Sequence, residues 1–356
     1  MDIANKINFN FATTQKLIKL IGQIDSFKGR WQAVEGKENV YLRELRKIAT
    51  IQSIGSSTRI EGATLTDAEV KELLDNIKIT KLTSRDSQEV MGYYDTLEII
   101  YDNYRDIPLT ESSIKSLHSA LLKYSTKDER HKGNYKNLSN QVVAKYPGGV
   151  EKTIFRTTEP HLVGKEMEEV LSWTNNVLES GEIHPLIIIG TFVYDFLSIH
   201  PFQDGNGRLS RLLTTLLLLR SDYQFIQYVS FENIIEERKG DYYRVLMDGQ
   251  KDRYSENERI DAWLLFFFDC LVALTQRLDV KYNSFKAKGG YLNERQKKIL
   301  EFIRTSQLVK VSDIAKNLPE YSPNTIRKDL IYLRDEKVIT SVGVGRGTVY
   351  VVEEES

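Results

Sequence analysis

A potential base, a potential metal ligand and two cations lie within twelve positions of this sequence. They belong to the run His200-Pro201-Phe202-Gln203-Asp204-Gly205-Asn206-Gly207-Arg208-Leu209-Ser210-Arg211. The His200 imidazole has an ordinary pKa near neutrality, so it can accept a proton. Asp204 supplies hard oxygen atoms, which suit the Mg²⁺ that accompanies a nucleotide. The spacing therefore predicts a base beside an anion-binding site.

Small residues and arginines follow the aspartate and predict a phosphate-binding turn. Gly205, Asn206 and Gly207 accept left-handed or crowded backbone conformations, which can direct several N–H groups toward one point. A helix that starts there adds its unpaired amides and the positive end of its dipole. Because Arg208 and Arg211 are three residues apart, their guanidinium groups share a face of that helix and can bind phosphate oxygens.

The run resembles the signature of Fic-domain proteins, His-Pro-Phe-x-Asp-Gly-Asn-Gly-Arg-x-x-Arg, at every specified position. The resemblance implies transfer of AMP from ATP to a Ser, Thr or Tyr hydroxyl of a target protein or of the chain itself. It implies that His200 deprotonates the hydroxyl and that Asp204 holds Mg²⁺. It also implies that the backbone of residues 205–207 forms an anion hole, and that Arg208 and Arg211 contact the β- and γ-phosphates. Relatives that act as kinases depart from the Gly-Asn-Gly pattern, so nucleotidyl transfer is favoured over phosphorylation.

A second motif, Ser57-Thr58-Arg59-Ile60-Glu61-Gly62, lies far upstream. It resembles the inhibitory motif of Fic proteins, Ser/Thr-x-x-x-Glu-Gly/Asn. In those relatives the glutamate pairs with the second arginine of the cradle, which is Arg211 here. A carboxylate bound to Arg211 removes a partner of the γ-phosphate and adds a like charge where ATP must lie. The resemblance implies an autoinhibited resting state, with Ser57, Glu61 and Gly62 as the inhibitory residues.

Composition limits the classes of protein and of partner. A chain of 356 residues with 41% hydrophobic residues predicts two or three globular domains, and a net charge of −1 gives no global attraction to nucleic acid or anionic membranes. One cysteine, Cys270, excludes an intramolecular disulfide framework. The sequence contains no run long enough to span a membrane and no evident signal peptide, which predicts a cytoplasmic protein without membrane partners.

Hydrophobic periodicity predicts a mainly α fold. The resemblance implies that it is a Fic-type helical core with a small β-hairpin flap, and the last elements resemble a winged helix domain. Apolar residues recur at three- and four-residue spacing through most of the first 285 residues. Thr66 and Glu69 form a capping-box pattern, Thr110 is a further N-cap, and Pro185 opens another helix. The expected helices include residues 66–74, 90–104, 110–124, 163–178, 186–199, 212–219 and 260–278.

The periodicity changes between residues 133 and 156. Residues 141–144 and 152–155 predict two short strands joined by a turn at 146–149. In Fic proteins a hairpin at this position, called the flap, binds the backbone of the target as an added strand. The resemblance therefore implies that the first strand docks the target near the base. Its residues are Gln141, Val142, Val143 and Ala144.

Two further features, the segment 241–244 and His118, can be explained either by a functional role or by packing in the hydrophobic core. Asp241-Tyr242-Tyr243-Arg244 resembles the Fic segment whose tyrosine packs near the adenine, which implies nucleotide contacts for Tyr242 and Tyr243. Aromatic side chains at helical spacing are at least as typical of a core. His118 lies in a helical apolar stripe and is interpreted as a core or surface histidine rather than a site residue.

The last part of the chain predicts a separate domain. Lys286-Ala287-Lys288-Gly289-Gly290 has the composition of a linker. We therefore expect an N-terminal helical region with the inhibitory motif (1–105), a catalytic core (106–285), a linker (286–290) and a winged helix-turn-helix domain (291–356). In the last domain the expected helices are 294–305, 311–317 and 324–336, and the expected strands are 338–341 and 348–352.

A recognition helix that begins near Ser322 would enter a major groove by its N-terminal end. Arg327, Lys328 and Arg346 would then contact phosphates. Residues 291–356 carry 11 Lys and Arg against 10 Asp and Glu, a balance of +1, which is weaker than the usual basic footprint of a DNA-binding module. DNA, another protein and a second copy of this chain all stay open as partners of this domain.

Two other functions remain open beside adenylylation. In one, the core is a nucleotide sensor and the protein is a DNA-binding transcriptional regulator. His200 and Asp204 argue against a sensor, because a sensor needs the cradle but neither a base nor a metal ligand. In the other, the enzyme transfers a different nucleotide or phosphocholine, which the motif alone does not exclude.

Overall fold

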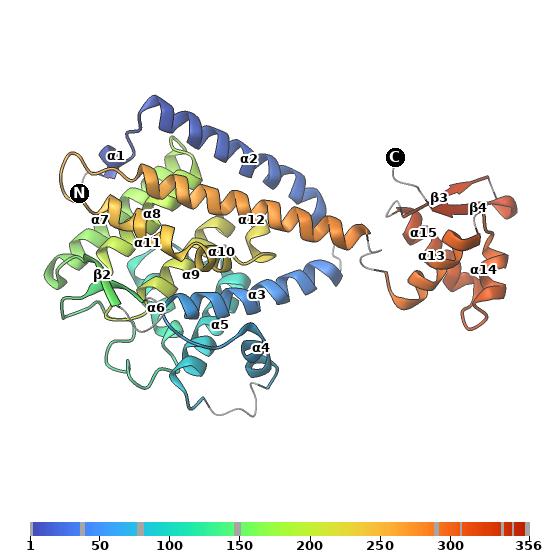
Figure 1. Cartoon of the computed structure of the whole chain (residues 1–356), viewed down its shortest axis with the longest axis horizontal. Coiled ribbons are helices and arrows are strands. Elements are labelled where there is room, and N and C mark those ends of the chain that lie inside the picture. The colour runs from blue at the N-terminus through green and yellow to red at the C-terminus, as the bar shows by residue number, and fades with distance from the viewer. Residues whose placement is uncertain are drawn as a thin grey trace. The chain divides into compact units, whose positions relative to one another are not determined.

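The computed structural model describes residues 3–35, 40–76, 82–145, 151–287, 292–306, 308–335, 338–343 and 345–352. The chain divides into two compact units. Residues 1–38 and 42–278 form the first unit, and residues 39–41 and 279–356 form the second. The first unit is a bundle of helices with one hairpin, and the second is a small domain of three helices and two strands (Figure 1).

The first unit begins with helices that precede the hairpin. They are α1 (Ile3–Lys6), α2 (Phe11–Glu35), α3 (Val40–Ile60), α4 (Asp67–Asp75), α5 (Arg85–Asn103) and α6 (Glu111–Leu121). The hairpin consists of β1 (Gln141–Lys145) and β2 (Glu151–Arg156). The later elements are α7 (Pro160–Ser180), α8 (Pro185–Ile199), α9 (Asn206–Arg220), the 3₁₀ turn η1 (Gln224–Gln227), α10 (Phe231–Glu237), α11 (Lys239–Gly249) and α12 (Asp261–Ala287).

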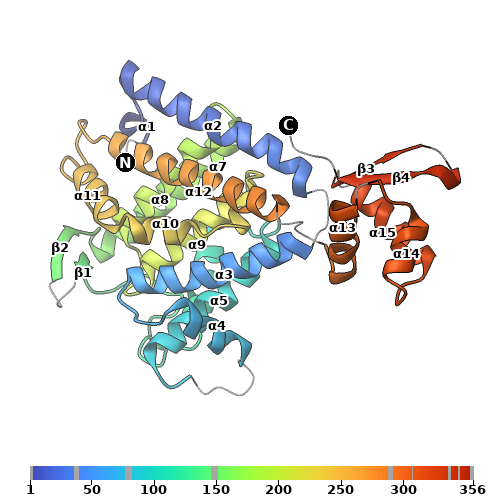
Figure 2. The same ribbon diagram turned by 45° about the vertical axis from the view of Figure 1, so that its right-hand side comes forward.

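Helices α8 and α9 form the centre of the first unit. Nearly every residue of both helices is buried, which agrees with their almost continuous apolar sequence. They pack on each other, and α7 and α5 cover them. Figures 1 and 2 both place α8 and α9 inside the bundle, with α2 and α12 running alongside each other on the outside. The loop between α8 and α9 is therefore held between two buried helices.

Several helix starts follow from local sequence. Thr66 and Glu69 make the expected capping box at α4, because the Thr66 side chain accepts from the Glu69 N–H and the Glu69 side chain accepts from the Thr66 N–H. Thr110 caps α6 through the Ser113 N–H. Pro185 is the first residue of α8, as predicted. Helices α5, α7 and α12 are longer than the periodicity predicts, because polar residues at their ends continue the helix.

The hairpin is antiparallel and lies at an edge of the helical core in both views (Figures 1 and 2). Gln141 pairs with Arg156 and Val142 with Phe155, and the register shifts between Val142 and Val143. Such a shift is typical of a β-bulge, which bends a strand and changes the direction of its side chains. The predicted turn at 146–149 lies outside the described residues.

The second unit has the order of a winged helix. Its elements are α13 (Glu294–Ser306), α14 (Val311–Asn317), α15 (Pro323–Asp335), β3 (Ile339–Val342), the 3₁₀ turn η2 (Gly345–Gly347) and β4 (Val349–Val352). Strands β3 and β4 pair antiparallel, and Val309 bridges to Tyr350 beside them. Buried Ile299, Ile314, Ile326 and Leu330 form its core with their neighbours. These elements agree with the predicted ones to within one or two residues at each end.

The end of α12 corrects the predicted position of the linker, and the described helices can be tested for membrane-spanning length. Helix α12 continues to Ala287, so the first two residues of the predicted linker are helical, and residues 288–290 lie outside the described part. Among the helices described, none combines the length and the apolar character needed to cross a bilayer.

Candidate functional site

His200 ends α8 in a conformation that is rare for a residue with a side chain. Its φ is 53° and its ψ is 61°, in the left-handed region, so the chain turns sharply between α8 and α9. Its Nδ1 lies 3.3 Å from the Leu197 carbonyl oxygen. Because a carbonyl only accepts, Nδ1 carries the proton in this contact, and Nε2 is left with the lone pair. Burial and the nearby Lys136 lower the pKa of His200 to about 4, so the ring is neutral at physiological pH.

The loop after His200 has an internal brace. The Asn206 side chain accepts from the Phe202 N–H at 2.8 Å and donates to the Phe202 carbonyl at 2.7 Å. Gly205 has a φ of 81° and precedes α9 without a side chain that could cap the helix. The amides at the start of α9 are therefore not occupied by a capping group, as an anion hole requires. The Asn206 side chain itself shapes the loop and does not point freely to a ligand.

Asp204 is held by two arginines. It accepts from the Gly205 N–H at 2.6 Å, from Arg208 at 3.3 Å and from Arg85 at 3.3 Å. Glu89 completes a ring of charges, because it lies 2.7 Å from Arg85 and 3.3 Å from Arg208. Burial raises the pKa of Asp204, but Arg208 and the other donors outweigh it and lower the pKa overall. Sequence reasoning missed Arg85 and Glu89, which no local motif connects to Asp204.

Arg211 is buried and bound to the upstream motif. Its Nη2 donates to Glu61 Oε1 at 2.8 Å and to the Ser57 carbonyl at 2.9 Å, and its Nε donates to Ser57 Oγ at 2.7 Å. The Glu61 carboxylate also lies against Gly207, where a Cβ atom would come within 2.1 Å of Oε1. The structure thus places Glu61 between Arg211 and the backbone of the anion hole.

The charge of Glu61 is stabilised despite its surroundings. Burial raises the pKa of Glu61, but Arg211, then Arg208 and His200, lower it by more, so its pKa is below the ordinary value of 4.5. The pKa of Arg211 is raised further above its already high value, because Glu61 outweighs the effect of burial. The Glu61–Arg211 contact is therefore an ion pair throughout the neutral pH range.

The end of α3 that carries Glu61 is fixed by side chains from other helices. Arg59 binds Glu236 of α10 at 2.8 Å and 3.0 Å and Asp67 of α4 at 2.9 Å. Lys239 of α11 donates to the Ile60 carbonyl at 2.8 Å. Gly62 then leaves the helix with a φ of 107°, which favours glycine.

A cavity of about 220 Å³ joins these groups. His200, Asp204 and residues 205–207 line it, together with Glu61 and Arg85. Tyr242 and Tyr243 of α11 and Gln141 and Val142 of β1 also line it, as the resemblance implies. The backbone of Val143 and Ala144 is in β1, but their side chains lie outside the described part of the chain. Arg208 and Arg211 are not among the lining residues: both are buried, Arg208 in contact with Glu89 and Arg211 in contact with Glu61, which itself lines the cavity.

Both arginines nevertheless keep donors that could serve an anion. Among the described residues, Nε and Nη1 of Arg208 and Nη1 of Arg211 are buried without a hydrogen-bond partner. A buried unpaired donor on a charged group is costly, so natural proteins rarely retain one without a ligand or a functional reason. Nη1 of Arg208 lies 3.3 Å from Glu89 Oε2, so Nε of Arg208 and Nη1 of Arg211 are the two of these donors without a hydrogen bond or ion pair among the described residues.

His118 is buried, as its apolar stripe predicts, but it also supports the loop. Its ring stacks on Phe202 with centroids 3.7 Å apart, and its Nε2 lies 3.0 Å from the Asp204 carbonyl. Its Nδ1 accepts from the Gly133 N–H at 3.0 Å. The two contacts together require a neutral ring with the proton on Nε2, and burial lowers the pKa of His118 to about 4.

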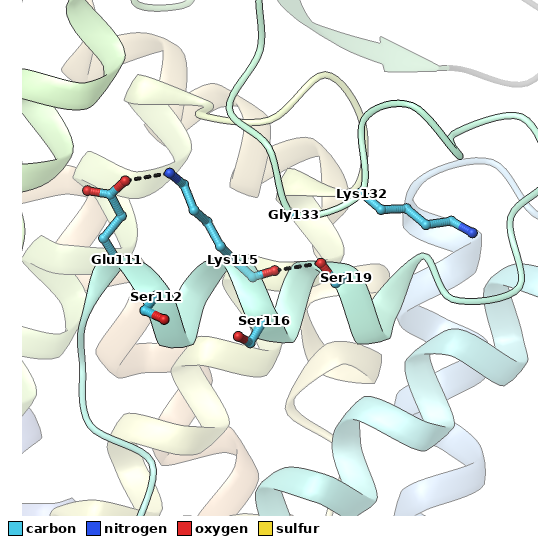
Figure 3. Close-up of a pocket in the computed structure, with 7 residues that line it drawn as sticks. All are labelled: Glu111, Ser112, Lys115, Ser116, Ser119, Lys132 and Gly133. Carbon is cyan, nitrogen blue, oxygen red and sulfur yellow. Dashed lines mark hydrogen bonds and ion pairs between the residues drawn. The ribbon is translucent and has the colours of Figure 1, made fainter.

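A larger cavity elsewhere is less suited to chemistry. It measures about 490 Å³ and lies along the outer face of α6 (Figure 3). Lys115 pairs there with Glu111 at 2.5 Å, and the Ser119 hydroxyl donates to the Lys115 carbonyl at 3.0 Å. Most residues that line this cavity come from α6 alone, whereas those of the smaller cavity come from five elements or more.

Comparisons with known proteins find matches for two parts of the chain. Residues 108–218 match the model of the Fic/DOC family, and residues 295–345 match the model of DeoR-like helix-turn-helix domains. The protein adenylyltransferase Fic of Drosophila grimshawi is 27% identical over 234 residues, which cover 65% of this chain and 43% of that protein. The protein of the same name from Drosophila melanogaster is 27% identical over 249 residues, 69% of this chain and 45% of that protein. The chain thus spans less than half the length of these curated relatives.

Solved structures share the fold. A Fic family protein from Desulfovibrio desulfuricans aligns with a TM-score of 0.65 and 22% identity over 99% of this chain and 98% of that chain. A Fic domain containing signaling protein from Bacteroides thetaiotaomicron aligns with a TM-score of 0.59 and 25% identity over 71% of this chain and 94% of that chain. The first of these likenesses extends over both units of the fold.

Proposed function

We propose that this chain, which contains a Fic domain followed by a DeoR-like helix-turn-helix domain, transfers AMP from ATP to a Ser, Thr or Tyr hydroxyl of a protein. The acceptor oxygen bonds to the α-phosphorus, the bond from that phosphorus to the β-phosphate oxygen breaks, and pyrophosphate leaves. The observation that carries the proposal is that His200, Asp204 and residues 205–207 line one cavity, while the contact of His200 Nδ1 with the Leu197 carbonyl leaves the lone pair on Nε2.

His200 would take the hydroxyl proton on Nε2. The contact of Nδ1 with Leu197 favours the tautomer that leaves Nε2 unprotonated. A pKa of about 4 makes the ring a weak base in the resting state. The negative charge of a bound triphosphate would raise the pKa of His200, because an opposite charge stabilises the imidazolium. The base would therefore become stronger when the substrate is present.

The cradle would bind the phosphates through amides and guanidinium groups. The uncapped start of α9 offers backbone donors, and the unpaired donors of Arg208 and Arg211 offer charged ones. Phosphoryl-type transfer depends mainly on positioning and on neutralising charge, which such fixed donors supply. Tyr242 and Tyr243, which line the same cavity, would contact the adenine.

Asp204 would hold Mg²⁺ together with the phosphates. Among the described residues no group of three or more His, Cys, Asp or Glu side chains could hold an ion alone. One carboxylate does fit Mg²⁺, which is commonly bound through one or two carboxylates, substrate phosphates and water. The ion would neutralise charge on the phosphate oxygens. Arg85 and Arg208 now pair with Asp204, so part of this pairing must open when the ion arrives.

Glu61 would keep the enzyme autoinhibited. It occupies Arg211 and lies against Gly207, where the phosphates would bind. The remaining cavity of about 220 Å³ is smaller than the roughly 300 Å³ at the lower end of ligand pockets. ATP would therefore bind productively only after the carboxylate leaves Arg211.

The hairpin would dock the target. It is a sheet of two strands, so each strand has one edge without a strand partner in the described part of the chain. A target segment added to such an edge is held through its backbone, with little dependence on its side chains. Gln141 and Val142 line the cavity, which would bring the acceptor hydroxyl toward His200.

The DeoR-like domain would bind duplex DNA. Arg327 and Lys328 are exposed on α15, where a recognition helix presents its phosphate contacts. The side chain of Arg346 lies outside the described part of the chain. The regulator that only senses nucleotides is not favoured, because a sensor has no use for a neutral base facing the phosphate site.

Isotope transfer tests the proposed activity. The wild-type chain, Glu61→Gly and His200→Ala with Glu61→Gly are incubated with Mg²⁺ and ATP labelled at the α- or the γ-phosphate. We expect protein to be labelled by α-labelled ATP only. Glu61→Gly should incorporate the most label, and the double variant His200→Ala, Glu61→Gly should incorporate little. Label from γ-labelled ATP alone would contradict nucleotidyl transfer and indicate a kinase.

A further inference from the structure

The strained turn at His200 is held from outside the motif. A left-handed residue with a side chain costs about 1–3 kcal/mol and persists only where its surroundings fix it. The carbonyl groups on both sides of His200 are each bound by Lys136: Nζ donates to the Ile199 oxygen at 3.1 Å, and the backbone N–H donates to the Pro201 oxygen at 2.8 Å. One residue thus fixes the backbone immediately before and after the base.

The same ammonium group is bound to both ends of the hairpin. Lys136 Nζ donates to Asn140 Oδ1 at 2.8 Å and to Thr157 Oγ1 at 2.7 Å. Asn140 immediately precedes β1, and Thr157 immediately follows β2. Asn140 also donates to the Phe202 carbonyl at 2.9 Å, and Thr157 donates to the Asn140 carbonyl at 2.9 Å. The residues that flank the hairpin, Asn140 and Thr157, are therefore joined to the turn at His200 by one network of hydrogen bonds.

Lys136 is an unusual choice for a structural brace. It is only 3% exposed, and all three ammonium donors go to uncharged oxygens rather than to a carboxylate of the described residues. Burial, followed by Arg253, lowers the pKa of Lys136 to about 8. A buried cation without a direct counter-ion is costly, so an uncharged brace would be the more stable solution. The charge therefore calls for a functional explanation.

We infer that Lys136 is a positioning residue, which aligns the target-docking hairpin with His200 and keeps a positive charge beside the imidazole. The inference rests on the proposed function and deepens it. Of the charged groups that shift the pKa of His200 most, Lys136 favours the neutral ring, whereas Glu61 and Asp204 favour the protonated one. The hydroxyl of a docked target would thus lie beside the unprotonated His200 imidazole, whose position relative to the hairpin is fixed by Lys136.

The test separates the charge of Lys136 from its hydrogen bonds. All variants are made in the full-length Glu61→Gly chain. Lys136→Met removes the charge and the three bonds. Thr157→Val removes one of the three ammonium bonds, together with the bonds of the Thr157 hydroxyl to Asn140, but leaves the charge. Lys165→Met is the matched control, because Lys165 is 75% exposed on α7 and has no part in the site. Circular dichroism melting shows whether each variant folds.

Two quantities are measured on each variant. The first is the initial rate of protein labelling from α-labelled ATP as a function of pH, with the affinity for ATP measured separately. The second is the NMR titration of the His200 ring in chains with labelled histidine, assigned by comparison with His200→Ala.

We expect Lys136→Met to slow labelling about 10- to 100-fold, because a base misplaced by about 1 Å loses rate on this scale. The affinity for ATP should stay within about twofold, since its donors lie on α9. The pKa of His200 should rise above about 4, and the acidic limb of the labelling profile should move up with it. Thr157→Val should slow labelling severalfold without moving the limb, and Lys165→Met should change nothing.

The inference is overturned if Lys136→Met folds and keeps both the labelling rate and the His200 titration of its parent. If Lys136→Met does not fold, Thr157→Val decides, and an unchanged labelling rate there overturns the alignment. If the Glu61→Gly parent incorporates no label at all, the proposed function fails. The His200 titration then still tests the charge of Lys136, because it needs no catalysis.

Discussion

Helices α9 and α15 each carry two cationic residues within their first six positions, but the side chains are buried in one helix and exposed in the other. Helix α9 starts with Asn206 and buries Arg208 and Arg211, each against a carboxylate. Helix α15 starts after Ser322, which caps it through the Thr325 N–H, and it exposes Arg327 and Lys328. The uncapped and buried terminus is a preorganised site for one anion, whereas the capped and exposed terminus offers a charged surface.

The difference follows from the surroundings of each helix rather than from its first turn. Helix α9 lies within the bundle, and the ends of α3 and α5 supply Glu61 and Glu89 to its arginines. Helix α15 buries only one face, on which Asp329 binds Arg295 of α13 at 2.5 Å. Its basic residues stay in solvent, where salt screens them. Removing the partners of the buried cations should therefore have larger effects than removing the exposed cations.

The largest effect is expected from Glu61→Gly. A hydrogen bond to a charged group contributes about 1.5–3 kcal/mol, so loss of this carboxylate should raise AMP transfer about 10- to 100-fold. The measurement is the initial rate of labelling from α-labelled ATP. Glu44→Gly is a control in the same helix, since Glu44 is exposed and remote from the cradle. Equal rates for Glu61→Gly and the wild type would contradict inhibition by Glu61 at the start of α9.

A smaller effect is expected when both exposed cations of α15 are removed. The double variant Arg327→Ala, Lys328→Ala should weaken binding of duplex DNA and reduce the slope of log affinity against log salt by about 2, because each phosphate contact contributes about 1. Fluorescence anisotropy over a series of salt concentrations measures this slope. Lys297→Ala removes a charge that pairs with Glu294 on α13, and it is the control. No DNA binding by the wild-type chain at low salt would contradict the role of α15.

Ser57→Ala should weaken the contacts that hold Arg211 only in part. The Ser57 hydroxyl accepts one bond from Arg211, while its carbonyl and Glu61 keep two others. Loss of one such bond contributes about 0.5–1.5 kcal/mol, so AMP transfer should rise about two- to tenfold. A rise as large as that of Glu61→Gly would show that the hydroxyl and not the carboxylate holds Arg211.

The smallest effect is expected from pH. The pKa of Glu61 is lowered in the folded protein, so the ion pair is fully formed above the ordinary value of 4.5 and is lost only as pH falls through the lowered pKa. The ratio of Glu61→Gly to wild-type transfer rates should therefore stay within about twofold between pH 6 and pH 8. A ratio that falls severalfold toward pH 6 would mean that Glu61 binds a proton in this range.

The residues of the site that could be predicted are those whose chemistry is local. Gly205 and Gly207 indicate a special backbone, and Thr66 with Glu69 indicates a cap, because the responsible contacts span few residues. Glu61 could be paired with Arg211 only through a family motif, since 150 residues separate them.

The residues that were missed have no local signal. Lys136 reads as one more polar residue of a loop, and its bond to Ile199 spans 63 residues. Arg85 and Asp204 are 119 residues apart, and His118 reads as part of an apolar stripe although it also binds the Asp204 carbonyl. The contacts of these side chains depend on how α5, α6 and the hairpin pack around the motif, which periodicity does not specify.

The contact between Glu61 and Gly207 has a kinetic consequence. The carboxylate fills the volume beside the glycine backbone, so under the proposed function it and the nucleotide would exclude one another from that volume. Inhibition of this type is competitive: the concentration of ATP shifts the balance by mass action, and the Michaelis constant for ATP rises more than the turnover number falls. Under the proposed function, the cellular concentration of ATP would then set the fraction of molecules in which Glu61 occupies Arg211.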